Sequence, residues 1–522
     1  MRKAKDIARY FQHLPPANVR RGTVNFMYYV STRGNGGKVT SAQAIKQGIA
    51  ADGGLFVPES LPAFSEAELK AMLGMSYSER AVHVLGKFLC DYSEEELTAY
   101  CEKAYSEDNF RSSGTPAPVV SLNDRMSVLE LYHGPTSAFK DMALQLMPHL
   151  LAGALEKTGE KKDAFILTAT SGDTGKAALE GYRDAPRVKI MVFYPVDGVS
   201  SVQKLQMSTQ TGENVFVCPV NGNFDDAQSG VKRIFSDKTA IDYMNERGYF
   251  FSSANSINWG RLAPQIVYYV SAYCDMVSAG TIEFGDTIDV CVPTGNFGDI
   301  FAAYIAKKCG LKLGRLVCAS NKNNVLTDFF NTGRYNRNRN FYTTMSPSMD
   351  ILISSNLERL LYYIAGSSVT ADCMKRLNSN GKYTVSSEVL KESTKEFYGY
   401  CASEEQTGSC IAEIYKNYKY LIDPHTAVGV YCAQKYLEEV NTSNKILCVS
   451  TASPYKFASN VYKSLTGKVL ADEFEYIDAL SAFTGTIPPK PLSELRSKEI
   501  RFNPSLSFSP SEMLSCVKKA AE

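Results

Sequence analysis

Short apolar segments that alternate with helical stretches constrain this chain more than any other feature of its sequence. They lie at residues 164–167, 188–194, 214–220, 288–292, 316–319 and 446–449. Continuous apolar strands separated by helices are typical of parallel sheets that are covered by helices on both faces. Ligands of such sheets bind beyond the carboxyl ends of the strands. The sequence therefore predicts an α/β fold in which the loops that follow the strands carry the chemistry.

The alternation covers only part of the 522 residues, a length that corresponds to roughly two to three domains. We divide the chain into an N-terminal extension (1–26), a helix-rich N-terminal domain (27–125), a central region (126–465) and a C-terminal tail (466–522). Within the central region we expect a smaller α/β subdomain at about 160–265, a larger subdomain that includes 270–325 and 440–465, and a helical insertion at about 325–440.

The first 26 residues carry six basic residues and one acidic residue. They contain no apolar segment of the kind that a secretory signal needs, which excludes such a signal. An organelle transit peptide stays open, although the segment is poor in serine. We expect a non-essential extension, because a second methionine, Met27, stands directly before a strand-like run.

Composition excludes several classes of function. The 56 basic and 55 acidic residues nearly cancel, which argues against nucleic acid or an anionic membrane surface as partner. No apolar run approaches the roughly 18–20 residues that cross a bilayer. The 13 cysteines include no Cys-x-x-Cys pair, and the five histidines have no ligand spacing with them, so no metal site is expected. Buried free thiols indicate a cytoplasmic protein. We expect a monomer that acts on a small molecule.

The loop Thr-Gly-Asn-Phe-Gly-Asp at 294–299 joins a predicted buried strand to a predicted helix. Its two glycines let the backbone approach an anion closely, and free N–H groups at a helix start point outward. The loop therefore predicts a phosphate site, with a plain tight turn as the alternative. No Lys-Ser pair follows, so it is not a Walker loop.

A second loop, at 168–176, also joins a strand to a helix. Its four hydroxyl groups and its backbone N–H groups can hold a carboxylate. The pair Gly175-Lys176 resembles the end of a nucleotide-binding P-loop. However, Thr170 stands where that loop needs glycine, and Ala177 stands where it needs serine or threonine, so the sequence disfavours a P-loop.

A third loop, His-Gly-Pro-Thr-Ser-Ala-Phe-Lys-Asp at 133–141, places Lys140 at the start of a helical stretch. A single lysine in such a place is usually a solvated surface charge. A lysine at a helix N-terminus can instead be held neutral as a nucleophile, as Schiff-base chemistry requires. The loop by itself leaves both interpretations open.

A fourth loop, at 252–261, offers hydroxyls, amides and one arginine, Arg261, within ten residues. Such a set of donors suits a second anion. The alternative is a helix N-cap with Arg261 on a solvated face.

Taken together, the chain resembles threonine synthase, a pyridoxal-phosphate enzyme of fold type II (the tryptophan-synthase-β group), in its longer fungal and bacterial branch. The resemblance runs from about residue 27 to 462 and depends on segments that match in order: 133–141, 170–175, 255–258 with Arg261, 295–299, 346–351 and 423–427. An ordered series is more specific than any single match, and it favours Lys140 as a nucleophile. The implied fold has parallel sheets flanked by helices.

The resemblance implies roles for individual residues. Lys140 is the implied catalytic residue, which forms the Schiff base with pyridoxal 5′-phosphate and then serves as base and acid. The cofactor-binding residues that it implies are Lys140, Gly295, Asn296, Phe297, Gly298, Asp299, Thr451 and Asp173. Thr451 is the implied hydroxyl partner of the pyridine nitrogen, whereas Asp173 stands where shorter relatives carry asparagine. The implied substrate-binding residues are Ser171, Gly172 and Thr174 for the carboxylate, and Asn255, Ser256 and Arg261 for the phosphate.

The implied reaction is the conversion of O-phospho-L-homoserine and water to L-threonine and phosphate, the last step of threonine biosynthesis. One alternative is another fold type II lyase or dehydratase, which would need no second phosphate site and so leaves Arg261 unexplained. The other alternative is a threonine-synthase-like protein that binds the cofactor without full turnover. In its favour is Ser453, which replaces the histidine of the common family pattern Thr-Ala-His-Pro-x-Lys-Phe.

Overall fold

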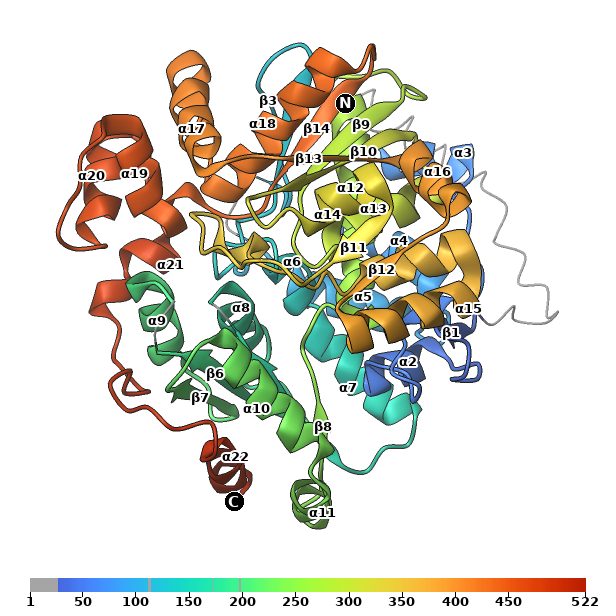
Figure 1. The fold of residues 1–522 in the computed structure, drawn as a ribbon, viewed down its shortest axis with the longest axis vertical. Coiled ribbons are helices and arrows are strands. Elements are labelled where there is room, and N and C mark those ends of the chain that lie inside the picture. The colour runs from blue at the N-terminus through green and yellow to red at the C-terminus, as the bar shows by residue number, and fades with distance from the viewer. Residues whose placement is uncertain (1–26, 111–113, 171, 197–198) are drawn as a thin grey trace, which may run out of the picture.

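The computed structural model describes residues 27–110, 114–170, 172–196 and 199–522. The predicted extension at 1–26 lies outside these residues. In the described part of the chain, two larger sheets stand side by side with helices packed around them (Figure 1). The prediction of an α/β fold with parallel sheets flanked by helices is confirmed.

The larger sheet has six strands in the order β13-β10-β9-β14-β4-β3, all parallel except β3 at one edge. Its strands are β3 (Val119–Ser121), β4 (Met126–Glu130), β9 (Ile288–Pro293), β10 (Leu313–Ser320), β13 (Phe397–Cys401) and β14 (Lys445–Ser450). Strand β9 is buried along its whole length because both of its faces are covered. Val290 and Val292 pack in the same core as α12 (Trp259–Ser278) and α13 (Gly298–Lys308), whereas Cys291 packs with α18 (Pro424–Glu439).

The smaller sheet has four parallel strands in the order β7-β6-β5-β8. They are β5 (Asp163–Ala169), β6 (Val188–Pro195), β7 (Val215–Val220) and β8 (Tyr249–Ser252). The helices around them are α8 (Asp173–Gly181), α9 (Ser201–Ser208), α10 (Phe224–Ser236) and α11 (Lys238–Glu246). The last helix, α22 (Met513–Ala521), returns to this sheet and packs against β7, α10 and α11 (Figure 1). Its buried Met513 and Val517 complete the core there, so part of the C-terminal tail packs with the smaller sheet.

Helices dominate the N-terminal residues. The elements are β1 (Tyr29–Ser31), α2 (Ser41–Gln47), β2 (Phe56–Pro58), α3 (Glu66–Met72), α4 (Tyr77–Phe88) and α5 (Glu94–Ala104). Each of these four helices begins with a capping box, in which Thr40, Ser65, Ser76 or Ser93 accepts from the backbone three residues on. Such caps satisfy N–H groups that a helix start leaves without partners, which is why these boundaries are sharp.

The segment at 325–440 is mostly helical, as predicted, but it also contains strands. Its elements are α14 (Val325–Thr332), β11 (Arg334–Asn336), α15 (Leu357–Asn380), β12 (Lys382–Thr384), α16 (Ser387–Glu396), β13, α17 (Glu404–Tyr418) and α18. The edge strand β13 was not predicted, nor were β4 and β8. Gly399 at the centre of β13 is closely approached by α14, since an added Cβ would lie 3.0 Å from Thr327 Cα. Because β13 is short and has a glycine at its centre, its sequence gives only a weak signal for a strand.

The two sheets meet around the short helix α6 (Asp141–Leu144), which α7 (Met147–Lys157) follows. Helix α6 packs against both α12 and α8. The last turn of α8 comes so close that a Cβ added to Gly181 would lie 2.1 Å from the carbonyl oxygen of Leu144. Helix α6 follows Lys140 directly, so this contact fixes the position of α8 relative to that lysine.

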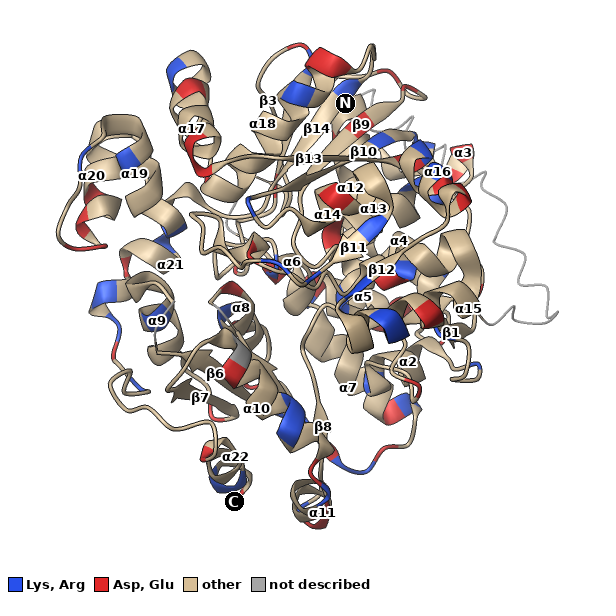
Figure 2. Cartoon of the chain, in the orientation of Figure 1, with Lys and Arg blue, Asp and Glu red and all other residues tan. Residues whose placement is uncertain are grey.

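The remaining helices are α19 (Ala458–Thr466), α20 (Glu475–Thr484) and α21 (Lys490–Ser493). No helix in the described part of the chain is long and apolar enough to cross a membrane. Figure 2 shows acidic and basic residues interspersed over the helices that flank the two sheets, in keeping with the balanced charge.

We expect Gly181→Ala to destabilise the protein, because the added Cβ meets backbone that cannot move aside. Overpacking of this kind usually costs about 1–3 kcal/mol, which lowers the apparent melting temperature of a chain of this length by roughly 1–3 °C. Gly74→Ala is the matched control, since a Cβ there has no atom within 4 Å. A thermal-shift measurement in which both variants melt with the wild type would contradict the close contact.

Candidate active site

Lys140 lies at the start of α6 with its side chain buried, only 8% of the residue being exposed. Its Nζ is 3.4 Å from Ser348 Oγ and 3.8 Å from the carboxylate of Asp173. The alternative of a solvated surface charge is therefore wrong.

Burial lowers the pKa of Lys140 to about 8, because it disfavours the ammonium form. The nearby positive charges of Arg261 and Lys456 lower this pKa further, whereas Asp173 opposes them. A lysine with such a pKa supplies free amine close to neutral pH, as a nucleophile or a base must.

The carboxylate of Asp173, in the first turn of α8, is bound on both of its oxygens. Its Oδ1 accepts from Lys456 Nζ at 2.8 Å and from Gln203 Nε2 at 2.8 Å, and its Oδ2 accepts from Ser348 Oγ at 2.9 Å. Burial acts to raise the pKa of Asp173, but Lys456 and Lys140 outweigh it and hold this pKa well below its ordinary value. Asp173 is thus a buried anion between two buried lysines.

The turn that carries Lys140 is tied to the loop after β14. Phe139 donates its N–H to the carbonyl of Thr451 at 2.8 Å, and Ser453 donates its N–H to the carbonyl of Ser137 at 3.1 Å. Ser137 itself has a left-handed backbone, with φ at 58°. These bonds bring the predicted Thr451 next to the lysine turn.

The predicted phosphate loop at 294–299 leads directly into α13. Phe297 takes a left-handed conformation, with φ at 62°, and Gly298 is the first helical residue. The first backbone hydrogen bond of the helix runs from the N–H of Phe301 to the carbonyl of Phe297. The N–H groups that precede Phe301 in the first turn therefore stay available to a ligand.

Asp299, the second residue of α13, is buried beneath this loop. It accepts from two hydroxyls through Oδ1, Tyr268 OH at 2.6 Å and Tyr269 OH at 2.5 Å. Burial raises the pKa of Asp299 to about 6. These contacts hold the start of α13 against α12, so Asp299 is placed to orient the loop.

The predicted carboxylate loop adopts a strained turn at the start of α8. Gly172 has φ at 142°, which favours glycine, and a Cβ there would lie 2.5 Å from Gln203. Thr170 Oγ1 accepts from the N–H groups of Gly172 and Gly175. Thr174 is half-buried at the same helix start, whereas Ser171 lies outside the described residues.

Arg261, in the first turn of α12, is buried, with 5% of the residue exposed. The alternative of a solvated arginine is therefore wrong, although the predicted helix N-cap is correct and belongs to Asn258. Arg261 Nη1 donates to the carbonyl of Ala254 at 2.7 Å, and burial lowers the pKa of this guanidinium to about 10. A buried cation without an ion-pair partner in the described residues is a natural receptor for an anion.

Asn255 and Ser256, the other predicted donors, are half-buried in the loop before α12. Ser256 Oγ accepts from Asn356 Nδ2 at 3.2 Å, and that same amide donates to the carbonyl of Asn296 at 2.9 Å. The fourth loop therefore lies beside the phosphate loop.

Several residues of this site were not assigned roles from the sequence. They are Ser348, Lys456, Gln203, Asn356 and His425. Ser348 and His425 lie in segments that match the family, and Lys456 lies in the matched pattern around Ser453, so a signal existed. Nothing in the sequence singled out Gln203 or Asn356, because their contacts arise only when distant segments pack together.

His425 orients the segment that contains Ser348. Its Nε2 accepts from the N–H of Ser348 at 3.1 Å, so Nδ1 carries the proton and donates to Asp423 Oδ2 at 2.6 Å. Ser348 O in turn lies 2.7 Å from where a Cβ of Gly295 would be. The phosphate loop and Lys140 are thus linked through one serine.

The residues present fit a cofactor with an aldehyde and a phosphate. Lys140 supplies a buried amine of lowered pKa, and the start of α13 supplies free N–H groups. Helix N-termini bind phosphate through such groups and through the helix dipole.

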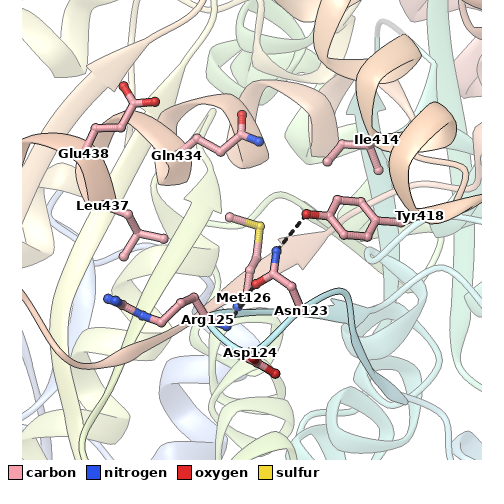
Figure 3. A pocket seen from close by; sticks show the side chains of 9 residues that line it. All are labelled: Asn123, Asp124, Arg125, Met126, Ile414, Tyr418, Gln434, Leu437 and Glu438. Carbon is pink, nitrogen blue, oxygen red and sulfur yellow. Dashed lines mark hydrogen bonds between the residues drawn. The ribbon is translucent and has the colours of Figure 1, made fainter.

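A surface pocket of about 440 Å³ lies elsewhere (Figure 3). It is lined by residues that include Arg125, Met126 and Tyr418, and Asn123 donates to the Tyr418 hydroxyl there. Met126 is the first residue of β4, so this pocket lies at the amino end of a parallel strand, opposite the carboxyl ends that carry Lys140 and the loops.

Comparison with known proteins agrees with this geometry. The family described as "Pyridoxal-phosphate dependent enzyme" matches residues 116–452. "Threonine synthase N terminus" matches 28–105, and "Threonine synthase, C-terminal" matches 426–502.

Similar proteins cover most of the chain. Threonine synthase of Pseudomonas aeruginosa is 38% identical over 86% of this chain and 94% of its own. Human threonine synthase-like 1 is 41% identical over 81% of this chain, which spans 58% of that relative's length. The crystal structure of yeast threonine synthase superposes with a TM-score of 0.84 at 33% identity, covering 95% of this chain and 98% of its own. The pyridoxal-phosphate-bound threonine synthase of Brucella melitensis gives 0.83 at 34%, with the same coverage.

Fold and site thus define a pyridoxal-phosphate-dependent enzyme of fold type II. The matches at both ends of the chain, and relatives at 34–38% identity over most of its length, narrow this class. The chain belongs to the threonine synthase family.

We expect Lys140 in cofactor-free protein to react as a free amine with a midpoint near pH 8. Below that pH the ammonium form resists acylation, and raising the pH through 8 releases the amine. Competitive labelling with acetic anhydride, followed by peptide mass spectrometry, measures the acetylated fraction of Lys140 at each pH and so gives the midpoint. The exposed Lys463 is the internal reference for the reactivity of the reagent at each pH. A midpoint above pH 10 would contradict the effect of burial.

Proposed function

We propose that this chain is a threonine synthase that converts O-phospho-L-homoserine and water to L-threonine and phosphate, and hence a lyase acting on a phosphate ester. One observation carries the proposal. The site contains both Lys140, whose pKa is lowered, and a second buried cation, Arg261, which is separate from the predicted phosphate loop. The reaction handles two phosphates, one of the cofactor and one that leaves, and the site offers two groups of donors.

Lys140 is the catalytic residue of this proposal. Pyridoxal phosphate, when bound, withdraws electrons from the α-carbon of an amino acid. Lys140 Nζ would hold the aldehyde end of the cofactor, and its amine would take the α-proton of the substrate and return it at the end. Ser348 Oγ accepts from that amine at 3.4 Å and donates to the carboxylate of Asp173 at 2.9 Å, so it bridges the two groups.

The cofactor phosphate is assigned to the loop Gly295, Asn296, Phe297 and Gly298. Asp299 steadies this loop through two tyrosines. Thr451 is assigned to the pyridine nitrogen, and a neutral partner there does not force that nitrogen to be protonated. Asp173 belongs to the cofactor-binding set because it lies 3.8 Å from Lys140 Nζ.

The substrate's two anionic groups are assigned to the starts of two different helices. The carboxylate binds at the start of α8, through Ser171, Gly172 and Thr174, where free N–H groups and the helix dipole favour an anion. The leaving phosphate binds Asn255, Ser256 and Arg261 at the start of α12.

The division of the chain also stays our proposal: an N-terminal domain at 27–125, a catalytic region at 126–465 and a tail at 466–522. We further propose a cytoplasmic monomer that needs no nucleic acid and no metal. Support for the compartment comes from the cysteines, all of which are free thiols and most of which are buried.

A second candidate is a relative that binds the cofactor without making threonine. Two observations favour it. The relatives named threonine synthase-like 1 share 41% identity with this chain, and the Oγ of Ser453, at the family's histidine position, is buried without a hydrogen-bond partner in the described residues.

Purified protein loaded with pyridoxal phosphate and given O-phosphohomoserine should release threonine and phosphate in equal amounts. Lys140→Ala should abolish both products and the visible absorption of lysine-bound cofactor. Phosphate without threonine would favour the second candidate, and activity retained by Lys140→Ala would reject the role of this lysine.

Arg261→Leu should lower kcat/KM by roughly 10- to 150-fold, because a charge-assisted contact contributes about 1.5–3 kcal/mol. Cofactor binding and its absorption spectrum should persist, since the other loop holds that phosphate. Arg183→Leu is the matched control, with a side chain that is 46% exposed. Steady-state kinetics give the change in kcat/KM, and a titration with pyridoxal phosphate gives the change in cofactor affinity. If Arg261→Leu lost cofactor binding, our assignment of the two phosphate sites would be reversed.

A further inference from the structure

Lys456 is a second lysine at this site whose side chain is fully buried, at 0% exposure. It lies in the short 3₁₀ turn Pro454–Phe457 that follows β14. Its Nζ contacts Asp173 Oδ1 at 2.8 Å and donates to the carbonyl of Thr136 at 2.9 Å. Lys456 therefore joins the larger sheet, helix α8 and the turn that carries Lys140. A buried ammonium group is tolerated only when it is paired in this way.

The distances show which lysine Asp173 pairs with. Its carboxylate is 2.8 Å from Lys456 but 3.8 Å from Lys140, and Ser348 Oγ contacts the oxygen nearer to Lys140. Gln203 Nε2 donates to the other oxygen. The carboxylate is thus already coordinated when Lys140 approaches it.

Other charged groups face Lys140 from the surrounding elements. Arg261 approaches from α12, Asp299 from α13 and Asp141 from Lys140's own helix. His425 on α18 faces Asp173, but both of its ring nitrogens are engaged, by Asp423 and by the N–H of Ser348. Among these groups, Lys456 is the cation in direct contact with Asp173.

We propose that Lys456 is a positioning residue for the reaction at Lys140: by holding the carboxylate of Asp173, it prevents that carboxylate from becoming a close ion-pair partner of Lys140. The Lys140 amine is then available to the cofactor and to the substrate proton. The inference rests on the proposed function only in assigning that chemistry to Lys140.

Loss of Lys456 would raise the pKa of Lys140 in two ways. It removes a nearby positive charge, and it leaves an uncompensated carboxylate that attracts the ammonium form. Both effects raise the pKa of Lys140 above its value of about 8. The fraction of free amine at neutral pH must then fall.

The test uses full-length protein freed of cofactor and labelled with acetic anhydride over a range of pH. In Lys456→Met we expect the labelling midpoint of Lys140 to rise by about one pH unit or more, so that labelling at pH 7 falls about tenfold. The rate at which the protein takes up pyridoxal phosphate at pH 7 should fall by a similar factor and recover near pH 10. A purely structural loss would not recover with pH.

Three variants serve as controls. Lys456→Arg keeps the charge and should stay close to the wild type, as should Lys391→Met at an exposed site. The double variant Lys456→Met/Asp173→Asn removes the carboxylate as well, so its midpoint should lie no higher than that of the wild type. This double variant also carries the test if Lys456→Met does not fold.

An unchanged midpoint in Lys456→Met, or a double variant whose midpoint lies above the wild type, would overturn the proposal. The labelling needs no substrate. Failure to make threonine with a normal Lys140 titration would therefore reject the proposed function and leave this inference standing.

Discussion

The ion pair between Asp173 and Lys456 is the contact on which the rest of the active site depends. Asp173 belongs to a helix of the smaller sheet, whereas Lys456 follows the central strand β14 of the larger one. Ser348, from the mostly helical segment, donates to the same carboxylate. Each charge is buried, so a packing of the two sheets that separated these partners while keeping either of them buried would leave an uncompensated ion in low dielectric, which is strongly unfavourable. This ion pair, together with the close contact of Gly181 with Leu144, therefore sets the position of α8 relative to Lys140.

Close packing of α8 explains a sequence pattern that looked like nucleotide binding. A Cβ added to Gly175 would lie 2.4 Å from Thr170 Cγ2 and 2.7 Å from Val192 Cγ1, so glycine is needed there for helix and strand to approach. Lys176, the next residue, is buried and pairs with Glu180 at 3.0 Å. The pair Gly175-Lys176 thus serves packing and charge balance within the smaller subdomain. The departures at Thr170 and Ala177 correctly disfavoured a P-loop.

Much of this architecture could be predicted from the sequence because its main signals are local. The six apolar segments became strands β5, β6, β7, β9, β10 and β14, and the loops after β5, β9 and β14 meet near Lys140. The remaining strands are weaker: β8 has four residues, and β13 contains a glycine. Gln203 and Asn356 could not be predicted, since both act through hydrogen bonds to segments far away in sequence. The burial of Arg261 could not be predicted either. Arginine is usually exposed, and only the packing of α12 against its neighbours covers this one.

Ser453 stands where the family pattern has histidine, and its main-chain atoms, not its side chain, hold the loop after β14 against the lysine turn. Its backbone N–H donates to Ser137 C=O, and Ala452 bridges Ala138, so the loop after β14 holds the lysine turn through main-chain atoms that any side chain would supply. The Oγ of Ser453 is buried without a hydrogen-bond partner in the described residues, so the side chain of this serine adds no hydrogen bond to the framework. His425 cannot replace an imidazole at position 453, because releasing either nitrogen would break its bond to Asp423 or to Ser348. The serine therefore leaves the main-chain contacts of the lysine turn in place, and the pKa of Lys140 of about 8 suits the acceptance and return of a proton that we propose for it.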